Sequence, residues 1–272
     1  KRIKPLMKET TYEDDSLVQE PGTLEVSHVS FAYPGGEKIY EDFNLSATQG
    51  QIIGVTGAVA CGKSTLGKTF LCEYPYEGRI CFHGKELSGM TKAEQNGMVG
   101  YLGHDPELFN DSVRNNILLG DDDDAEKYLK AVCFDGEVAE MEEGMDTIVG
   151  NGGVRLSGGQ AQRLALARTL CHKRPVLILD DPFSALDRKT EKEVFANLRK
   201  LTADSIVILL SHRLYLFPKM DQVLWMEDGK VTAGTHEQIL EKFPEYARLY
   251  EAQADGADAH STQEGGLDHA EK

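Results

Sequence analysis

The stretch Gly57-Ala58-Val59-Ala60-Cys61-Gly62-Lys63-Ser64 fits the phosphate-loop pattern G-x-x-x-x-G-K-[ST], which joins a strand to a helix. The apolar segment 51–56 before it predicts a short buried strand, and a helix is expected over residues 63–71. A glycine-rich turn into a helix start points backbone N–H groups at phosphate oxygens, and the helix dipole reinforces them. The sequence therefore predicts a nucleotide-phosphate site.

The residue types of this loop suit ATP bound with Mg²⁺. Lys63 reaches the terminal phosphates, and the Ser64 hydroxyl can ligate the metal. The expected nucleotide-binding residues are Gly57, Ala58, Val59, Ala60, Cys61, Gly62, Lys63, Ser64 and Thr65. The alternative is an ordinary strand–turn–helix, with a prior of roughly one in twenty once the motifs downstream are counted.

Two further segments support the nucleotide site. The apolar run Val176–Asp180 predicts a buried parallel strand whose terminal acid, Asp180, holds magnesium. The string Leu156-Ser157-Gly158-Gly159-Gln160 places Ser157 as the N-cap of a helix. The phosphate-loop pattern is expected by chance in about one chain of this length in a hundred, and LSGGQ in roughly a few in ten thousand.

Together and in this order, these motifs resemble the nucleotide-binding domain of ATP-binding cassette (ABC) proteins from about Leu24 to Gln253. The resemblance implies an α/β fold of the P-loop NTPase class: a RecA-like core, an antiparallel β subdomain and a helical signature subdomain. Strands at 176–180, 205–210 and 222–226, with a helix at 189–201, agree with a parallel α/β core. The resemblance also implies that LSGGQ caps the γ-phosphate held by a second nucleotide domain, facing the first head to tail.

Three single residues match the family as well. Tyr33 occupies the position where an aromatic ring stacks on adenine, although an aromatic at a strand end is by itself more often core. Asp187 ends the stretch Ser184-Ala185-Leu186-Asp187, which resembles the D-loop at the dimer interface. His212 follows a predicted strand and matches the switch histidine that contacts the γ-phosphate.

Three positions depart from the family pattern. Asp181 stands where Glu usually polarises the attacking water, and its carboxylate is shorter by one carbon–carbon bond, about 1.5 Å. His104 replaces the Gln that contacts Mg²⁺; it is a candidate metal ligand, but a structural or surface histidine is about as frequent. Asn151 stands where exporters often carry Glu. Asp181 and His212 remain the candidate catalytic residues.

Composition limits the function classes. The chain has 272 residues and a formal net charge of −16, which argues against a nucleic-acid partner. No apolar run approaches the roughly 18 residues of a membrane span, and no secretory leader is visible, so a soluble fragment is expected. The five cysteines show no CxxC spacing and indicate reduced thiols.

The expected organisation is a linker at 1–22, an ABC ATPase domain at 23–253 and a disordered tail at 254–272. The closing stretch 234–253 is similar to the end of an ABC exporter half. The phosphate loop and the stretch 179–187 are similar to those of the multidrug-resistance-associated branch, which has one weakened site.

We therefore expect a motor domain that hydrolyses ATP, located with its transmembrane domains at the cytoplasmic face of a membrane. The alternatives are an ATP-binding clamp that barely hydrolyses, and a soluble ABC ATPase of DNA repair or translation.

Overall fold

The computed structural model describes residues 22–150 and 152–261. In this part of the chain a ten-stranded sheet has the order β5-β4-β1-β2-β12-β11-β3-β10-β9-β6. Its parallel strands are β3 (Ile52–Gly57), β6 (Val99–Leu102), β9 (Val176–Asp180), β10 (Ile206–Leu210) and β11 (Gln222–Glu227). Every residue of β3, β9 and β10 is buried, as strands covered on both faces require.

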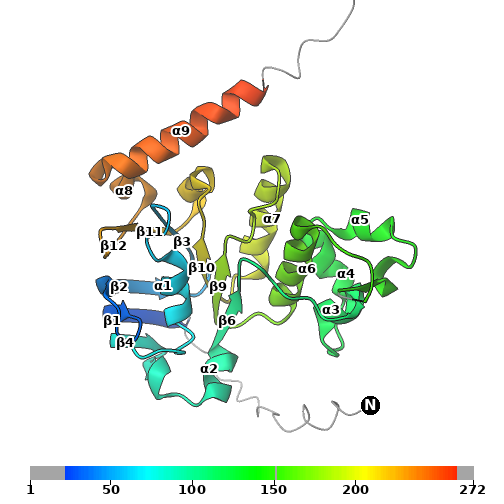
Figure 1. Cartoon of the computed structure of the whole chain (residues 1–272), viewed down its shortest axis with the longest axis horizontal. Helices are drawn as coiled ribbons and strands as arrows, with labels where there is room; N and C mark the ends of the chain where they lie inside the picture. The colour runs from blue at the N-terminus through cyan, green and yellow to red at the C-terminus, as the bar shows by residue number, and fades with distance from the viewer. Residues whose placement is uncertain (1–21, 151, 262–272) are drawn as a thin grey trace, which may run out of the picture.

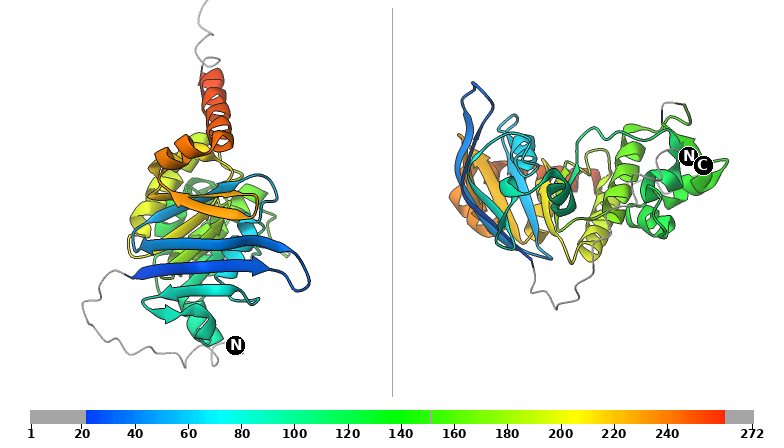
Figure 2. Two further views of the ribbon diagram at one scale, coloured as in Figure 1. Left: turned by 90° about the vertical axis from the view of Figure 1, so that its left-hand side faces the viewer. Right: turned by 90° about the horizontal axis from the view of Figure 1, so that it is seen from below.

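The other half of the sheet is mainly antiparallel and curls over the core (Figure 2). It contains β1 (Thr23–Ala32), β2 (Lys38–Thr48), β4 (Glu77–Phe82), β5 (Lys85–Glu86) and β12 (Lys230–Gly234). The register of β1 against β2 shifts after Val26 and again after Val29, which accounts for the irregular alternation in the sequence. This half shares one apolar cluster with β3, β9, β10 and β11, so the two halves fold on a common core.

Helices cover the sheet and build a separate helical region beside β6 and β9 (Figure 1). On the sheet lie α1 (Lys63–Thr69), α2 (Lys92–Met98), α7 (Arg188–Leu201) and α8 (His236–Lys242). The helix α9 (Pro244–Ser261) packs on α8 at its start and projects away from the sheet (Figure 1). The helical region contains α3 (Val113–Leu118), α4 (Ala125–Ala131), α5 (Asp135–Ala139) and α6 (Gly158–Cys171), with a small antiparallel sheet of β7 (Asp111–Ser112) and β8 (Ile148–Val149).

The predicted fold class is confirmed: a RecA-like core, an antiparallel β subdomain and a helical subdomain that carries the signature. The helix α9 continues to Ser261, beyond the expected end of the ATPase domain at residue 253, and the disordered tail at 254–272 stays a prediction. Lengthening an existing helix needs no new nucleus, so residues with a weak preference for helix can still extend it. The linker at 1–21, Asn151 and residues 262–272 lie outside the described residues. Among those described, no helix has the length and apolar character of a membrane span.

Candidate functional site: a nucleotide site

The phosphate loop forms where β3 ends at Gly57 and α1 begins at Lys63. Gly62 has a φ of 100°, and a Cβ at this position would lie 2.4 Å from Cγ2 of Ile39, so only glycine fits. The amides of residues 62–65 donate no hydrogen bond to any other described residue. These free donors at a helix start are what a phosphate group needs.

The Lys63 side chain is folded back into the loop. Its ammonium donates to the carbonyl oxygens of Ala58, at 2.9 Å, and Gly57, at 3.2 Å, and lies 3.7 Å from Sγ of Cys61. Lys63 is buried although it is charged, and the loop carbonyls offset part of the cost of its lost hydration. A phosphate that enters the loop competes with these carbonyls for the ammonium.

The two aspartates follow each other at the end of β9 but have different environments. Asp180 is buried, and the Tyr101 hydroxyl donates to its Oδ2 at 3.2 Å. Burial raises the pKa of Tyr101, and the neighbouring Asp180 charge adds to this, so the hydroxyl keeps its proton. Asp181 has a φ of 49°, its amide donates to the Leu210 carbonyl at 2.9 Å, and its Oδ1 lies 3.5 Å from Oγ of Ser211.

His212 brings the separate motifs together. The surrounding protein lowers the pKa of His212 by displacing part of its water, and the charge of Lys63 lowers it further, while Asp181 and Asp180 oppose this. The imidazole is therefore mainly neutral at pH 7 and keeps a nitrogen lone pair. His104 is exposed, and it contributes to the lowering of the pKa of His212.

The Tyr33 ring is 38% exposed and stands edge-on to two other aromatic rings. Its centroid is 5.0 Å from that of Phe31 and 5.3 Å from that of Tyr74, at interplanar angles of 88° and 84°. A partly exposed aromatic ring held by neighbouring rings suits stacking on a base.

The LSGGQ segment forms the start of α6 in the helical region, whereas α1 packs on the sheet (Figures 1 and 2). The Ser157 hydroxyl accepts from the Gln160 amide at 3.2 Å, and Gln160 Oε1 accepts from the Ser157 amide at 2.8 Å. This capping box confirms Ser157 as the N-cap. A Cβ at Gly158 would meet nothing within 4 Å, which leaves the helix start open.

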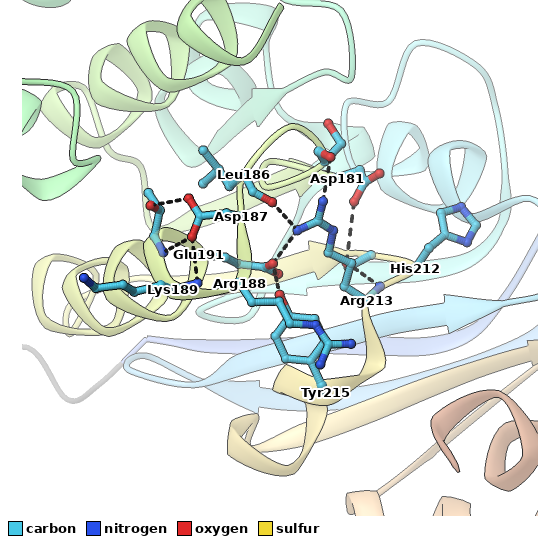
Figure 3. Close-up of polar contacts among 12 residues, drawn as sticks. Asp181, Leu186, Asp187, Arg188, Lys189, Glu191, His212, Arg213 and Tyr215 are labelled. Atoms are coloured by element: carbon cyan, nitrogen blue, oxygen red, sulfur yellow. Dashed lines mark hydrogen bonds and ion pairs between the residues drawn. The ribbon is translucent and has the colours of Figure 1, made fainter. Parts of the chain in front are cut away.

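A buried polar network beside the D-loop was missed by sequence reasoning (Figure 3). Asp187 caps α7, accepting from the amides of Lys189 and Thr190. Arg213 donates to the carbonyls of Ser184, at 2.7 Å, and Leu186, at 2.6 Å, and pairs with the fully buried Glu191 at 2.6 Å. Glu191 also accepts from the Tyr215 hydroxyl. An Arg that follows a His and a Glu in the first turn of a helix are too ordinary to reveal such a pairing from sequence.

Among residues 22–150 and 152–261, no group of three or more His, Cys, Asp or Glu side chains could hold a metal ion. The oxygen donors available for Mg²⁺ are the exposed Ser64 hydroxyl and the Asp180 carboxylate. Hard oxygen donors fit Mg²⁺, which commonly keeps several waters and takes one or two protein ligands. The imidazole of His104 fits less well.

Comparisons with known proteins agree with this geometry. The profile of the ABC transporter family matches residues 40–184. The chain is 35% identical to a probable multidrug resistance ABC transporter ATP-binding/permease protein, YheI, of Bacillus subtilis, over 87% of this chain and 42% of that protein. It is 36% identical to the ATP-dependent lipid A-core flippase of Pseudomonas fluorescens, over 91% of this chain and 42% of the flippase.

Among solved structures, a bacterial Atm1-family ABC exporter with ATP bound superposes with a TM-score of 0.79 at 30% identity, over 88% of this chain and 43% of that one. The chain thus spans less than half the length of these relatives. The strand–loop–helix geometry, the signature helix and the matched profile lead to one assignment: the chain belongs to the ABC transporter family.

Proposed function

We propose that this chain is the ATP-binding and ATP-hydrolysing motor domain of an ABC exporter. The observation that supports this most directly is that β3, β10 and β9 are neighbouring parallel strands, so the phosphate loop after β3, His212 after β10 and Asp180 at the end of β9 lie at one edge of the sheet. Lys63, the Asp180–Asp181 pair and His212 come from three separate segments of the chain, and each segment corresponds to a different motif of the family. A cation, a metal-seeking acid, a candidate base and a neutral imidazole at one edge of the sheet suit phosphoryl transfer to water.

Each side chain has a role in this proposal. Lys63 exchanges its carbonyl partners for the terminal phosphates of ATP, and Tyr33 stacks on adenine. Ser64 and Asp180 hold Mg²⁺, which neutralises phosphate charge when it is bound. Asp181 orients the attacking water and accepts its proton, and neutral His212 contacts the γ-phosphate.

We further propose that two nucleotide domains close head to tail, so that the open start of α6 in one completes the nucleotide site of the other. In the relatives, the nucleotide domain is part of proteins named as exporters, flippases and permeases. By this likeness, the present chain works with transmembrane domains at the cytoplasmic face of a membrane and uses ATP to drive export. No nucleic acid is involved.

One observation favours a second function, an ATP-dependent clamp that hydrolyses little. The short Asp181 side chain starts from a left-handed backbone that the Leu210 carbonyl holds in place, so it does not gain reach by a simple backbone adjustment. A misplacement near 1 Å costs on the order of a hundredfold in rate. In that case the second nucleotide domain performs the hydrolysis.

Calorimetry with Lys63→Ala tests the nucleotide site. A hydrogen bond to a charged group contributes about 1.5–3 kcal/mol, so ATP affinity should fall roughly 10- to 100-fold while adenosine binding changes little. The matched control is Lys68→Ala, which removes an exposed lysine from the same helix and should leave both affinities unchanged. Equal losses for ATP and adenosine would contradict the assignment.

A further inference from the structure

The N-terminal part of α9, residues 244–253, reaches the segment that carries His212. One face of the helix is formed by Tyr246 and the residues three, four and seven positions after it, which are Leu249, Tyr250 and Gln253. Tyr246 is fully buried, and its ring lies 6.5 Å from that of Phe217. Phe217 belongs to the short 3₁₀ helix η3 (Leu214–Lys219), which begins two residues after His212. The apolar face of α9 therefore places Gln253 directly over residues 212–214, which we call the switch segment.

The Gln253 side chain holds the backbone on both sides of residue 213. Its Nε2 donates to the His212 carbonyl at 2.8 Å, and its Oε1 accepts from the Leu214 amide at 2.8 Å. One orientation of the amide group satisfies both bonds, because one partner only accepts and the other only donates. Gln253 thus fixes the direction in which the backbone leaves His212.

Gln253 also contacts Arg188, the residue that directly follows the D-loop. Arg188 donates from Nη2 to the carbonyl oxygen of Gln253 at 2.7 Å, and its guanidinium lies 4.7 Å from the centroid of the Tyr215 ring. Arg188 follows Asp187 directly and opens α7. Between His212 and Leu214, Arg213 reaches the D-loop carbonyls of Ser184 and Leu186 (Figure 3). The switch segment is therefore held from two sides, by the D-loop and by α9.

We propose that Gln253 is a positioning residue for the switch histidine, and that α9 is part of the ATP-hydrolysing machinery. The inference rests on the proposed role of His212. A group that contacts a reacting phosphate must keep its place to within about 0.5 Å, and a supporting shell of hydrogen bonds provides this. Gln253 supplies two such bonds at the backbone of His212 and its neighbour, from an element distant in sequence from the other motifs.

The test is Gln253→Met in the assembled transporter. Methionine keeps the length and the helix preference of glutamine but makes neither hydrogen bond. We expect kcat for ATP hydrolysis to fall roughly tenfold, with KM within about twofold of wild type, because orientation is lost while the phosphate contacts remain. The control is Glu251→Met, which places the same residue at an exposed position of α9 and should leave kcat unchanged.

A double-mutant cycle with His212→Ala separates positioning from a general structural effect. If Gln253 acts through His212, adding Gln253→Met to His212→Ala changes kcat no further. The proposal is overturned if Gln253→Met lowers kcat equally in the wild-type protein and in His212→Ala. It is also overturned if Gln253→Met leaves the kcat of the wild-type protein unchanged. If the methionine variant does not fold, Gln253→Glu serves instead: it keeps the acceptor for Leu214, loses the donor to His212, and should show the same loss and the same absence of effect beside His212→Ala.

Failure of this inference is distinguishable from failure of the proposed function. If Lys63→Ala weakens ATP binding and His212→Ala lowers turnover, the motor function stands. A Gln253→Met variant with unchanged kcat then refutes only the role of α9. If His212→Ala leaves turnover unchanged, the role of His212 and the positioning role of Gln253 both fall. Unchanged ATP affinity in Lys63→Ala refutes the proposed nucleotide site itself.

Discussion

At the scale of single residues, the backbone at Asp181 bears on how its substitutions are interpreted. A φ of 49° is uncommon for residues other than glycine, and Asp and Asn tolerate it better than most. Asp181→Asn therefore removes the charge while the backbone is retained, which makes it the cleaner probe. Asp181→Glu lengthens the side chain by about 1.5 Å but must enter the same left-handed conformation.

In the assembled transporter, Asp181→Glu should raise ATP turnover roughly tenfold if the short carboxylate alone limits the chemistry, because the base then reaches the water. Steady-state ATP hydrolysis measures this, with Asp181→Asn as the comparison. A collapse of activity in Asp181→Asn would show that Asp181 already works as the base. Unchanged activity in both variants would support the clamp function.

Glu191 gives a prediction for the pH dependence of stability. Burial raises the pKa of Glu191 to about 7, although Arg213 opposes the shift, and its Oε1 has no hydrogen-bond partner among the described residues. The pKa of Glu191 is higher in the folded state than in the unfolded state. Its contribution to the free energy of unfolding is therefore full below about pH 4.5 and is lost as the pH rises through 7.

The measurable quantity is the unfolding free energy of wild type minus that of Glu191→Gln, from urea titrations at several pH values. Other groups titrate alike in both proteins, so the difference should fall by about 3 kcal/mol between pH 4.5 and 7 and stay level above it. A difference that rises over this interval would mean that Arg213 keeps Glu191 ionised throughout.

At the scale of elements, the helix caps were the most predictable feature. Ser157 and Gln160 have the spacing of a capping box, and the structure contains both of its hydrogen bonds. The network around Arg213 was not predictable, because its partners lie 22 to 29 residues away and a lone Arg or Glu carries no spacing signal. The contact of α9 with His212 was hidden for the same reason: Gln253 is 41 residues from its partner.

The signature cap allows a prediction for α6. Ser157→Ala removes the acceptor for the Gln160 amide and should lower the unfolding free energy by about 1 kcal/mol. ATP turnover of the assembled transporter should fall by more than this stability change explains, because Ser157 also stands at the proposed contact with the partner's γ-phosphate. Thr91→Ala removes the matching capping box of α2, far from the signature in sequence, and should lower stability without affecting turnover.

At the scale of the whole molecule, the charge of −16 opposes the proposed pairing of two such domains. Two equally acidic bodies repel each other, and added salt screens the repulsion. We expect the isolated chain to be a monomer without nucleotide. With MgATP and Asp181→Asn, sedimentation velocity should show a dimer that is favoured by raising the salt from about 50 to 300 mM. A dimer that weakens over this range would indicate complementary charges at the interface.

The architecture followed from the sequence because its main signals are local: a glycine loop after an apolar strand, and a run of buried parallel strands. The composition of residues 254–261 favours disorder, whereas α9, which begins at Pro244, extends through them, because lengthening a helix needs no new nucleus.

The position of Trp225 has a practical consequence. It is the only tryptophan of the chain, it lies in β11 beside the strand that feeds the phosphate loop, and its ring is 5.5 Å from Tyr246 of α9. Indole fluorescence shifts to longer wavelengths when water reaches the ring. The native protein therefore contains an optical reporter at the root of α9: movement of this helix away from the sheet alters the emission spectrum, in a rapid-mixing experiment that needs no attached dye.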